Sequence, residues 1–236
     1  MKVLAVIPAR GGSKDIKNKN LLKIEKKSLV SIAISKAKKS KYISKIALTS
    51  DDEKILKEGK KSNLEYCIKR PNKYATDKAS IFKTIKHTVE WFDKNHNWCP
   101  DIIAIILPTT PLRPLWHIET CLKKMIDKNL ESVMTIKKPE YPPYWMLKRG
   151  VKGKMKNLVK NGNKFLRRQE TPLVYQPAGT MWAFKIKILD QLIKSNKILP
   201  TKKTIGIIVP QDESINIDEY RHYKLAKSLF KKSANI

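Results

Sequence analysis

Short apolar runs alternate with longer amphipathic segments along most of the chain, and this alternation predicts strands separated by helices. We predict strands at residues 2–7, 43–48, 64–68, 102–107, 132–137, 180–184 and 205–209. Helical spacing predicts helices after Ser28, after Asp51 or Asp52, over 81–92 with Asp77 as a candidate N-cap, over 115–128 and over 218–231. The expected fold is a three-layer α/β domain with a mostly parallel sheet, whose ligands bind beyond the carboxyl ends of its strands.

The alternation breaks off between residues 139 and 176. This stretch is rich in proline, glycine and lysine, yet Tyr141 and the run Tyr144–Leu147 gather apolar side chains in one place. Such a segment is too apolar for a plain linker, so it indicates a packed excursion or an oligomer contact. We predict a single domain over residues 1–236 with an inserted subdomain at 139–176.

The charge balance is strongly positive, since 50 Lys and Arg stand against 21 Asp and Glu, a net charge of +29. Nucleic acid must therefore be considered as a partner. However, only seven of these residues are arginines, and the lysines are scattered over every predicted helix without a basic stripe interleaved with aromatic residues. This pattern favours a lysine-rich solvated surface over nucleic-acid binding. The excess charge would still attract small anions.

Several other classes of protein are disfavoured. No apolar run approaches the roughly 20 residues that span a bilayer, and the first apolar stretch is too short for a signal peptide, so we expect a cytoplasmic protein without a membrane contact. Three cysteines without CxxC spacing indicate reduced thiols. His117 and Cys121 lie four residues apart on a predicted helix, but two ligands do not make a zinc site, and we expect them on a helix surface.

The first candidate for chemistry is Arg10-Gly11-Gly12-Ser13-Lys14, which follows the first predicted strand directly. Adjacent glycines let backbone N–H groups converge on an anion, while Arg10, Lys14 and the nearby Lys19 can donate to phosphate oxygens. The string matches neither GxxxxGK[ST] nor GxGxxG, which disfavours a P-loop ATPase and a dinucleotide-binding dehydrogenase. A tight surface turn with nearby lysines remains the alternative.

The wider pattern resembles the acylneuraminate cytidylyltransferases, which activate sialic acids and related ulosonic acids. The blocks that carry the resemblance are Ile7–Lys14 with Lys19-Asn20, Thr49–Glu53, Arg70-Pro71 with Ala75–Ser80, Leu107–Arg113, Arg168-Gln169, Gly179, and Ser214–Asp218. They occur in the family's order and cover essentially the whole chain. The resemblance implies a Rossmann-like nucleotidyltransferase fold and transfer of CMP from CTP to the anomeric hydroxyl of a 2-keto sugar acid, with release of pyrophosphate. It also implies Mg²⁺ or Mn²⁺ as cofactor and a homodimer formed through the inserted subdomain.

The resemblance also implies a site, carried over residue by residue. Nucleotide contacts would come from Arg10, Gly11, Gly12, Ser13, Lys14, Lys19, Asn20, Arg70, Ala79 and Ser80. The acid substrate would meet Thr109, Arg168, Gly179 and Trp182, the metal would bind Asp218 and Asn216, and the catalytic residues would be Arg10, Lys19 and Asp218. Asp218 has a structural alternative, because it stands where the last predicted helix begins and could be its N-cap.

Five positions depart from the family pattern. Leu107 replaces a usual glutamine, Ala178 a usual asparagine, Trp182 a common tyrosine, Asp15 a common glycine, and Asn216 the first of two aspartates. The sequence therefore leaves the identity of the ulosonic acid open. The remaining rivals are a nucleotidyltransferase for another sugar or base, a nucleic-acid-binding protein, and a catalytically impaired homologue.

Overall fold

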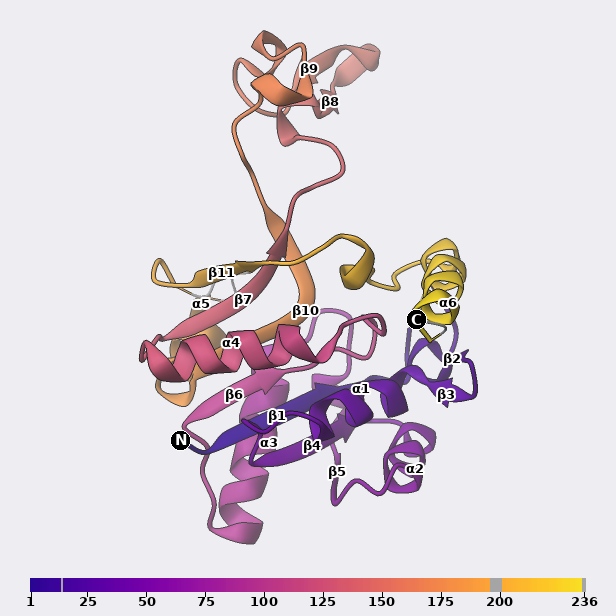
Figure 1. Cartoon of the computed structure of the whole chain (residues 1–236), viewed down its shortest axis with the longest axis vertical. Helices are drawn as coiled ribbons and strands as arrows, with labels where there is room; N and C mark the ends of the chain where they lie inside the picture. The colour runs from indigo at the N-terminus through magenta and orange to yellow at the C-terminus, as the bar shows by residue number, and fades with distance from the viewer. Residues whose placement is uncertain (14, 196–200, 235–236) are drawn as a thin grey trace.

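A seven-stranded sheet forms the centre of the molecule in the computed structural model, which describes residues 1–13, 15–195 and 201–234 (Figure 1). Its strands are β1 (Val3–Pro8), β4 (Lys45–Ser50), β5 (Tyr66–Lys69), β6 (Ile102–Ile105), β7 (Ser132–Lys137), β10 (Gln176–Lys185) and β11 (Ile205–Ile208), in the spatial order β11-β7-β10-β6-β1-β4-β5. β10 runs antiparallel to β6 and β7, whereas the other neighbouring strands are parallel. The prediction of a mostly parallel sheet is confirmed.

Helices cover both faces of the sheet, which confirms the three layers. One core cluster packs α1 (Leu29–Lys38), α2 (Glu53–Lys61) and α4 (Leu115–Asp127) against one face. The other packs α3 (Ile81–His96) and α5 (Leu189–Ser195) against the opposite face. Strand β1 serves both clusters, because its side chains alternate: Val3 and Ala5 point to one, Leu4 and Val6 to the other. A third cluster seats α6 (Tyr220–Ala234) on the amino-terminal part of α1.

The helix starts agree with the sequence at two places and differ at a third. The Ser28 hydroxyl accepts from Ser31 N at the start of α1, and the Asp52 carboxylate accepts from Lys54 N at the start of α2. Asp77 is not the N-cap of α3, as predicted, because that helix begins later and Ser80 holds the N-cap position. The carboxylate of Asp77 instead pairs with Arg10.

Strand β10 begins at Gln176, four residues before the predicted start at Thr180. Its pairing with β7 shifts register between Pro177 and Trp182, and Gly179 has a φ of 72° within that stretch. A positive φ is costly for residues other than glycine, so Gly179 permits the irregular backbone here. Because a bulge breaks the two-residue alternation of side chains, the strand pattern in the sequence is visible only after it.

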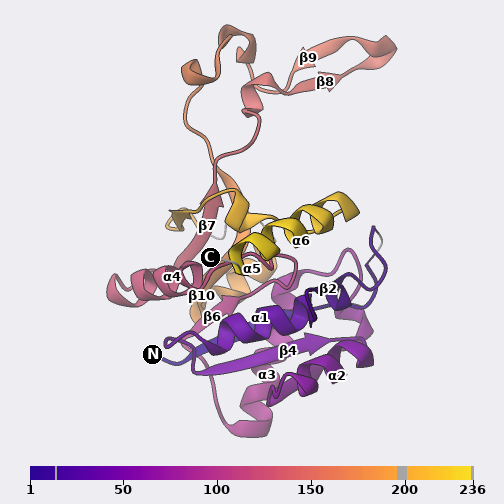
Figure 2. The same cartoon turned by 45° about the vertical axis from the view of Figure 1, so that its right-hand side comes forward.

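Between β7 and β10, residues 138–175 leave the sheet and form a projecting arm (Figures 1 and 2). The arm contains the hairpin of β8 (Leu147–Arg149) and β9 (Met155–Asn157). Its inner contacts are few: the Trp145 indole donates to Phe165 O over 2.8 Å, and the Tyr144 and Phe165 rings lie 5.0 Å apart. Most of its large apolar side chains are exposed, including Tyr141, Met146, Leu147, Val151, Met155, Leu158, Leu166, Leu173 and Tyr175. In the described part of the chain, no helix has both the length and the apolar character needed to cross a bilayer.

Candidate active site

A central cavity of about 270 Å³ opens beyond the carboxyl ends of β1, β5 and β6. This is the edge of the sheet where the fold predicted a ligand site. Of the predicted site residues, the cavity brings together Arg10, Ser13, Lys19, Asn20, Arg70, Ala79 and Thr109. The rest of its lining was not among the predicted site residues and comprises Pro8, Asp15, Tyr74, Thr76, Asp77, Ile81, Thr84, Leu107 and Pro108. Lys14, a predicted nucleotide contact, lies outside the described residues.

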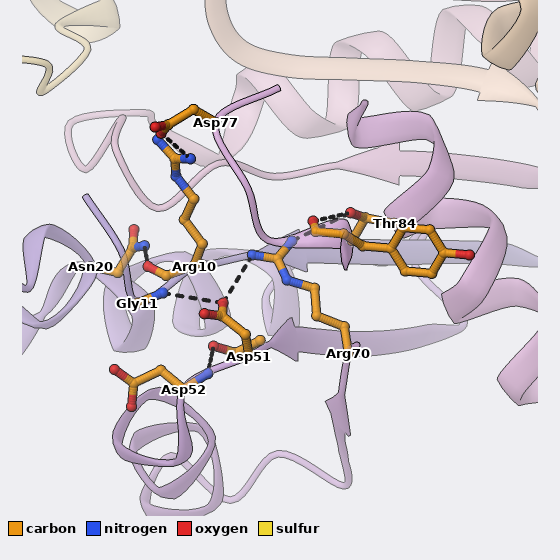
Figure 3. Close-up of polar contacts among 10 residues, drawn as sticks. Arg10, Gly11, Asn20, Asp51, Asp52, Arg70, Asp77 and Thr84 are labelled. Carbon is orange, nitrogen blue, oxygen red and sulfur yellow. Dashed lines mark hydrogen bonds and ion pairs between the residues drawn. The ribbon is translucent and has the colours of Figure 1, made fainter. Parts of the chain in front are cut away.

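The loop after β1 is held by two side chains from outside it (Figure 3). Gly11 N donates to the Asp51 carboxylate over 3.2 Å, and the Asn20 amide donates to Arg10 O over 2.9 Å. Gly11 is required by close approach, because a Cβ there would lie 2.7 Å from Oδ2 of Asp52. A Cβ added at Gly12 would meet no atom within 4 Å, so there is space for a side chain at that position. The Asn20 amide thus orients the backbone of the loop that carries Arg10.

Arg70 is a buried cation in the floor of the cavity. Its guanidinium lies 3.4 Å from the Asp51 carboxylate and 3.4 Å from the Thr84 hydroxyl (Figure 3). Burial lowers the pKa of Arg70, and the neighbouring Asp51 acts in the opposite direction. Asp51 therefore supports both the Arg10 loop and Arg70. Asp51 lies in the block Thr49–Glu53 that the sequence analysis identified. However, contacts between its carboxylate and partners far away in the sequence leave no pattern among neighbouring residues.

Three buried polar atoms near this cavity have no hydrogen-bond partner within the described residues: Nε of Arg70, Oγ of Ser80 and Oγ1 of Thr49. Buried polar groups without a partner are unusual in native proteins and often indicate a ligand or an ordered water. Ser80 directly follows Ala79, which lines the cavity. These atoms fit a polar ligand that brings its own donors and acceptors.

Arg10 and Asp77 form an ion pair across the cavity, with 2.5 Å between the guanidinium and the carboxylate (Figure 3). Their side chains are 34% and 38% exposed, so water weakens the pair. An anionic ligand in the cavity would compete with Asp77 for the same guanidinium. The loop that carries Asp77 thus supplies an anion where the sequence predicted a helix cap.

Lys19 connects the central cavity with the segment that contains Asp218. Its ammonium donates to Asp218 O over 3.2 Å and lies 3.9 Å from the carboxylate, although the two residues are 199 positions apart. A second cavity of about 490 Å³ lies beside this segment and is lined by Lys137, Gln176, Asn216, Asp218 and His222, among others. Lys19 lines the first cavity and Asp218 the second, so this pair stands between them.

The amides at the start of α6 are served by a histidine ring. Nδ1 of His222 accepts from Asp218 N over 3.4 Å and from Glu219 N over 3.2 Å. The Asp218 carboxylate instead accepts from the Asn216 amide nitrogen, over 3.0 and 3.2 Å. Oδ1 of Asn216 is buried without a hydrogen-bond partner in the part of the chain that the structure describes. Asp218 therefore remains open to a ligand and is not the cap that the sequence offered as an alternative.

The four predicted contacts for the acid substrate lie in different places. Thr109 lines the central cavity, and its carbonyl accepts from Ile217 N over 2.8 Å. Gly179 lies nearby in the irregular part of β10, where its carbonyl is 3.5 Å from the Thr110 hydroxyl. Trp182 packs edge-on against Phe82, 5.2 Å between ring centres. Arg168 lies in the arm, outside the central cavity, and its guanidinium donates to Pro139 O over 3.2 Å.

His117 and Cys121 are fully buried, which corrects the prediction of a helix-surface position. Nε2 of His117 lies 3.0 Å from the Glu213 carboxylate, so α4 holds the segment that leads to Asn216 and Asp218. Burial and the nearby Arg113 lower the pKa of His117 to about 4, which makes the ring neutral and Nε2–H the donor to Glu213. Burial raises the pKa of the Cys121 thiol to about 12. Within the described residues, no group of three or more His, Cys, Asp or Glu side chains converges on a metal position.

The lowered pKa of His117 predicts acid sensitivity. Because the unfolded ring titrates near 6.5 and the folded one near 4, its stabilising contribution is complete above pH 6.5 and declines as the pH falls toward 4. At pH 5 the expected loss is about 2 kcal/mol of unfolding free energy. Urea unfolding of wild type and His117→Gln between pH 7.5 and 4.5 measures it, since glutamine can donate to Glu213 but does not titrate. Equal pH slopes in the two proteins would contradict the assignment.

Comparisons with known proteins show the family to which the chain belongs. A family model described as cytidylyltransferase matches residues 4–233. Post-translational flagellin modification protein B of Campylobacter coli is 26% identical over 98% of this chain and 95% of its own length. CMP-N,N'-diacetyllegionaminic acid synthase of Campylobacter jejuni is 25% identical over 97% of this chain and 94% of that protein. N-acylneuraminate cytidylyltransferase of Escherichia coli is 34% identical, and there the match spans 52% of this chain and only 28% of the relative.

The same fold occurs among solved structures. CMP:2-keto-3-deoxy-manno-octonic acid synthetase, solved in complex with CTP, superposes with a TM-score of 0.70 at 17% identity and is covered over its whole length. The 4-diphosphocytidyl-2C-methyl-D-erythritol synthase of Anaerococcus prevotii superposes with a TM-score of 0.65 at 15% identity. Because the family model spans nearly the entire chain and the polar cavity lies at the expected edge of a sheet of this kind, the chain belongs to the cytidylyltransferase family of nucleotidyltransferases.

Proposed function

We propose that this protein transfers CMP from CTP to the anomeric hydroxyl of a sialic-acid-like 2-keto sugar acid and releases pyrophosphate. One observation carries the proposal: a single cavity gathers Arg10 and Lys19 from the connection after β1, Arg70 from the end of β5 and Thr109 from the loop after β6, and its lysine donates to Asp218 O. The names of relatives that match nearly the whole chain or a large part of it refer to CMP-activated or cytidylylated acids of this class. We propose that an acid of the same class is the acceptor for this protein.

Different residues of the cavity would contact different parts of CTP. Arg10 would exchange Asp77 for a phosphate oxygen, and Lys19 would neutralise charge on the triphosphate next to Asp218. Arg70 and Ser80, with their unpartnered buried atoms, would face the cytidine. The nucleotide would thus lie with its phosphates toward Lys19, so that the acceptor approaches from the side of Thr109 and Gly179.

Asp218 and Asn216 are the residues that would hold a divalent cation. They fit Mg²⁺ or Mn²⁺ because Asp218 offers an exposed carboxylate, Oδ1 of Asn216 is unpartnered, and Mg²⁺ is commonly bound by one or two carboxylates together with waters and substrate phosphates. Such an ion, when bound, supplies positive charge at the α-phosphate. To use Oδ1, the Asn216 amide must turn, because its nitrogen now faces Asp218.

The direct test is pyrophosphate release with CTP, UTP, GTP and ATP, each combined with N-acetylneuraminate, legionaminate, pseudaminate and 3-deoxy-octulosonate. We expect product only with CTP, a divalent cation and a 2-keto sugar acid. Activity with a sugar 1-phosphate and none with any ulosonic acid would favour a nucleotidyltransferase for another sugar. Tight, steeply salt-dependent oligonucleotide binding without pyrophosphate release would favour the nucleic-acid rival.

The acceptor side of the cavity is more apolar than the family pattern predicts. Leu107 lines the cavity where a glutamine is usual, and Ala178 replaces an asparagine in the irregular part of β10. The indole ring of Trp182 packs edge-on against the ring of Phe82. We therefore propose that an acid other than N-acetylneuraminate is the preferred acceptor, with the substrate panel deciding which.

We also propose that the arm pairs two copies of the chain. Ten large apolar side chains of the arm are exposed, and two of them, Val151 and Leu166, are each 85% exposed. Contiguous exposed apolar surface of this kind commonly marks a protein contact. Light scattering after size-exclusion chromatography should give a dimer for the wild type and a monomer for Leu166→Asp. An exposed apolar control outside the arm, Leu225→Asp, should remain dimeric.

Arg168 provides a prediction about the acid substrate. Because it lies in the arm and outside the central cavity of its own chain, contact with the acid requires that dimerisation brings the arm to a cavity. Arg168→Lys should raise the KM for the acid about tenfold and leave the KM for CTP nearly unchanged, since a planar guanidinium can bind a carboxylate through two hydrogen bonds. Steady-state kinetics with each substrate varied in turn measures both constants. Equal effects would place Arg168 in the scaffold.

A further inference from the structure

Arg113 is the largest fully buried side chain, with 1% of its surface exposed, and it is a cation. It ends the loop that begins at Leu107 and stands two residues before α4. All of its hydrogen bonds given by the structure go to neutral oxygens. Nη1 donates to the Thr110 hydroxyl over 2.7 Å, to Thr180 O over 2.7 Å and to Leu107 O over 3.3 Å, and Nη2 also donates to Leu107 O over 3.3 Å.

Such a side chain costs free energy. Burial lowers the pKa of Arg113 to about 9, and among the described residues no carboxylate forms an ion pair with it. A buried charge without a counter-ion is normally unfavourable, and an apolar side chain of similar size would avoid the cost. What an apolar residue cannot do is hold three acceptors from two segments at fixed directions, which the rigid planar guanidinium does.

The three acceptors belong to loop 107–110, which lines the central cavity, and to β10, which lies beside that loop. Leu107 lines that cavity and Thr110 follows its lining residue Thr109, while Thr180 follows Gly179 in the irregular part of β10. Thr110 also connects loop 107–110 with β10 directly, because its hydroxyl lies 3.5 Å from Gly179 O. Arg113 therefore lies behind the wall of the cavity, at the place where loop 107–110 meets β10.

A third segment is attached to the same loop. Ile217 N donates to Thr109 O over 2.8 Å, so the neighbours of Ile217, which are Asn216 and Asp218, take their position from loop 107–110. A displacement of this loop would move the acceptor contacts and Asp218 together. Arg70 and the Arg10 loop are instead held by Asp51 and Asn20. Arg10 and Arg70, the two arginines of the nucleotide side, thus have a support that is separate from loop 107–110.

We propose that Arg113 is a positioning residue that sets the spacing between loop 107–110 and Gly179-Thr180, and thereby the acceptor side of the site. It touches no substrate, because its guanidinium is fully buried behind the loop. The kinetic part of this inference rests on the proposed function, whereas the structural part does not. The proposal predicts that a change which removes the hydrogen bonds of the Arg113 guanidinium lowers kcat/KM for the acid and leaves the Kd for CTP nearly unchanged.

The experiment compares Arg113→Lys and Thr110→Val with wild type. Valine keeps the shape of threonine but removes the hydroxyl that Arg113 contacts at 2.7 Å. We expect kcat/KM for the acid to fall at least about tenfold in both variants, while calorimetric Kd values for CTP alone change less than about threefold. The stability control is Leu122→Ala, a core change on α4 that should lower the thermal midpoint without altering the KM for the acid.

Hydrogen exchange of the proteins without substrate provides a readout that does not depend on the reaction. Exchange should rise in peptides covering 107–110 and 178–181 in Arg113→Lys and Thr110→Val, with no rise in α3. Equal losses of CTP and acid binding, or a lower thermal midpoint with unchanged acid kinetics and exchange, would overturn the proposal. If wild type uses no 2-keto acid, the proposed function fails, and the exchange data alone decide the role of Arg113.

Discussion

Replacing Asp218 with alanine should lower kcat by at least about a hundredfold while the thermal midpoint changes little, because this carboxylate is the anion that meets both Lys19 and the proposed metal. Its side chain is 58% exposed, so truncation opens no core cavity. The amides at the start of α6 donate to His222, so they do not depend on the Asp218 carboxylate. Steady-state kinetics at saturating CTP and acid, with thermal melting alongside, measures both effects.

Asn216→Asp is the companion change to Asp218→Ala. A second carboxylate should lower the half-saturating Mg²⁺ concentration, and titration of Mn²⁺ by electron paramagnetic resonance should show tighter binding whether or not turnover changes. Asp218→Asn, which keeps the shape of the side chain, separates loss of charge from loss of contacts. Survival of kcat in Asp218→Ala together with a lower thermal midpoint would make Asp218 a structural residue, and the metal site would then have to lie elsewhere.

Lys19→Met should reduce kcat/KM for CTP by about a hundredfold or more. The Lys19 side chain is only 12% exposed and lies where the central cavity meets Asp218, so its charge acts through little water. Methionine keeps the aliphatic part of the side chain and removes the ammonium. The matched control is Lys17→Met, the same charge change at an exposed position two residues away, which should have no measurable effect.

Two constants, the Kd for CTP and the kcat at saturating CTP, separate the possible roles of Lys19. A role in phosphate binding predicts a weaker calorimetric Kd for CTP, whereas stabilisation of the leaving pyrophosphate predicts a lower kcat at saturating CTP. Wild-type values for both constants in Lys19→Met would exclude Lys19 from the machinery. The ion pair with Asp218 would then be a surface contact of small energetic worth.

The amino-acid sequence by itself determined the layered α/β fold, since apolar runs and helical spacing are properties of neighbouring residues. Ser28 and Asp52 cap their helices because a cap needs only a short polar side chain beside the first turn. The glycine-rich loop after β1 was visible for a similar reason. In each case the interacting atoms lie within a few residues of one another, so a short window of sequence contains the cause and the effect.

The tertiary structure decided which side chains support the site. Asp51 serves Gly11 and Arg70, partners 40 and 19 positions away, and Arg113 holds Thr180 across 67 positions. His117 was expected on a helix surface, yet it is buried against Glu213, 96 positions along the chain. Asp77 turned to Arg10 instead of capping α3. Whether a polar side chain caps its own helix or pairs with a distant charge depends on which partner the folded sheet brings within hydrogen-bond distance and at a suitable angle. Neither condition depends on the separation in sequence.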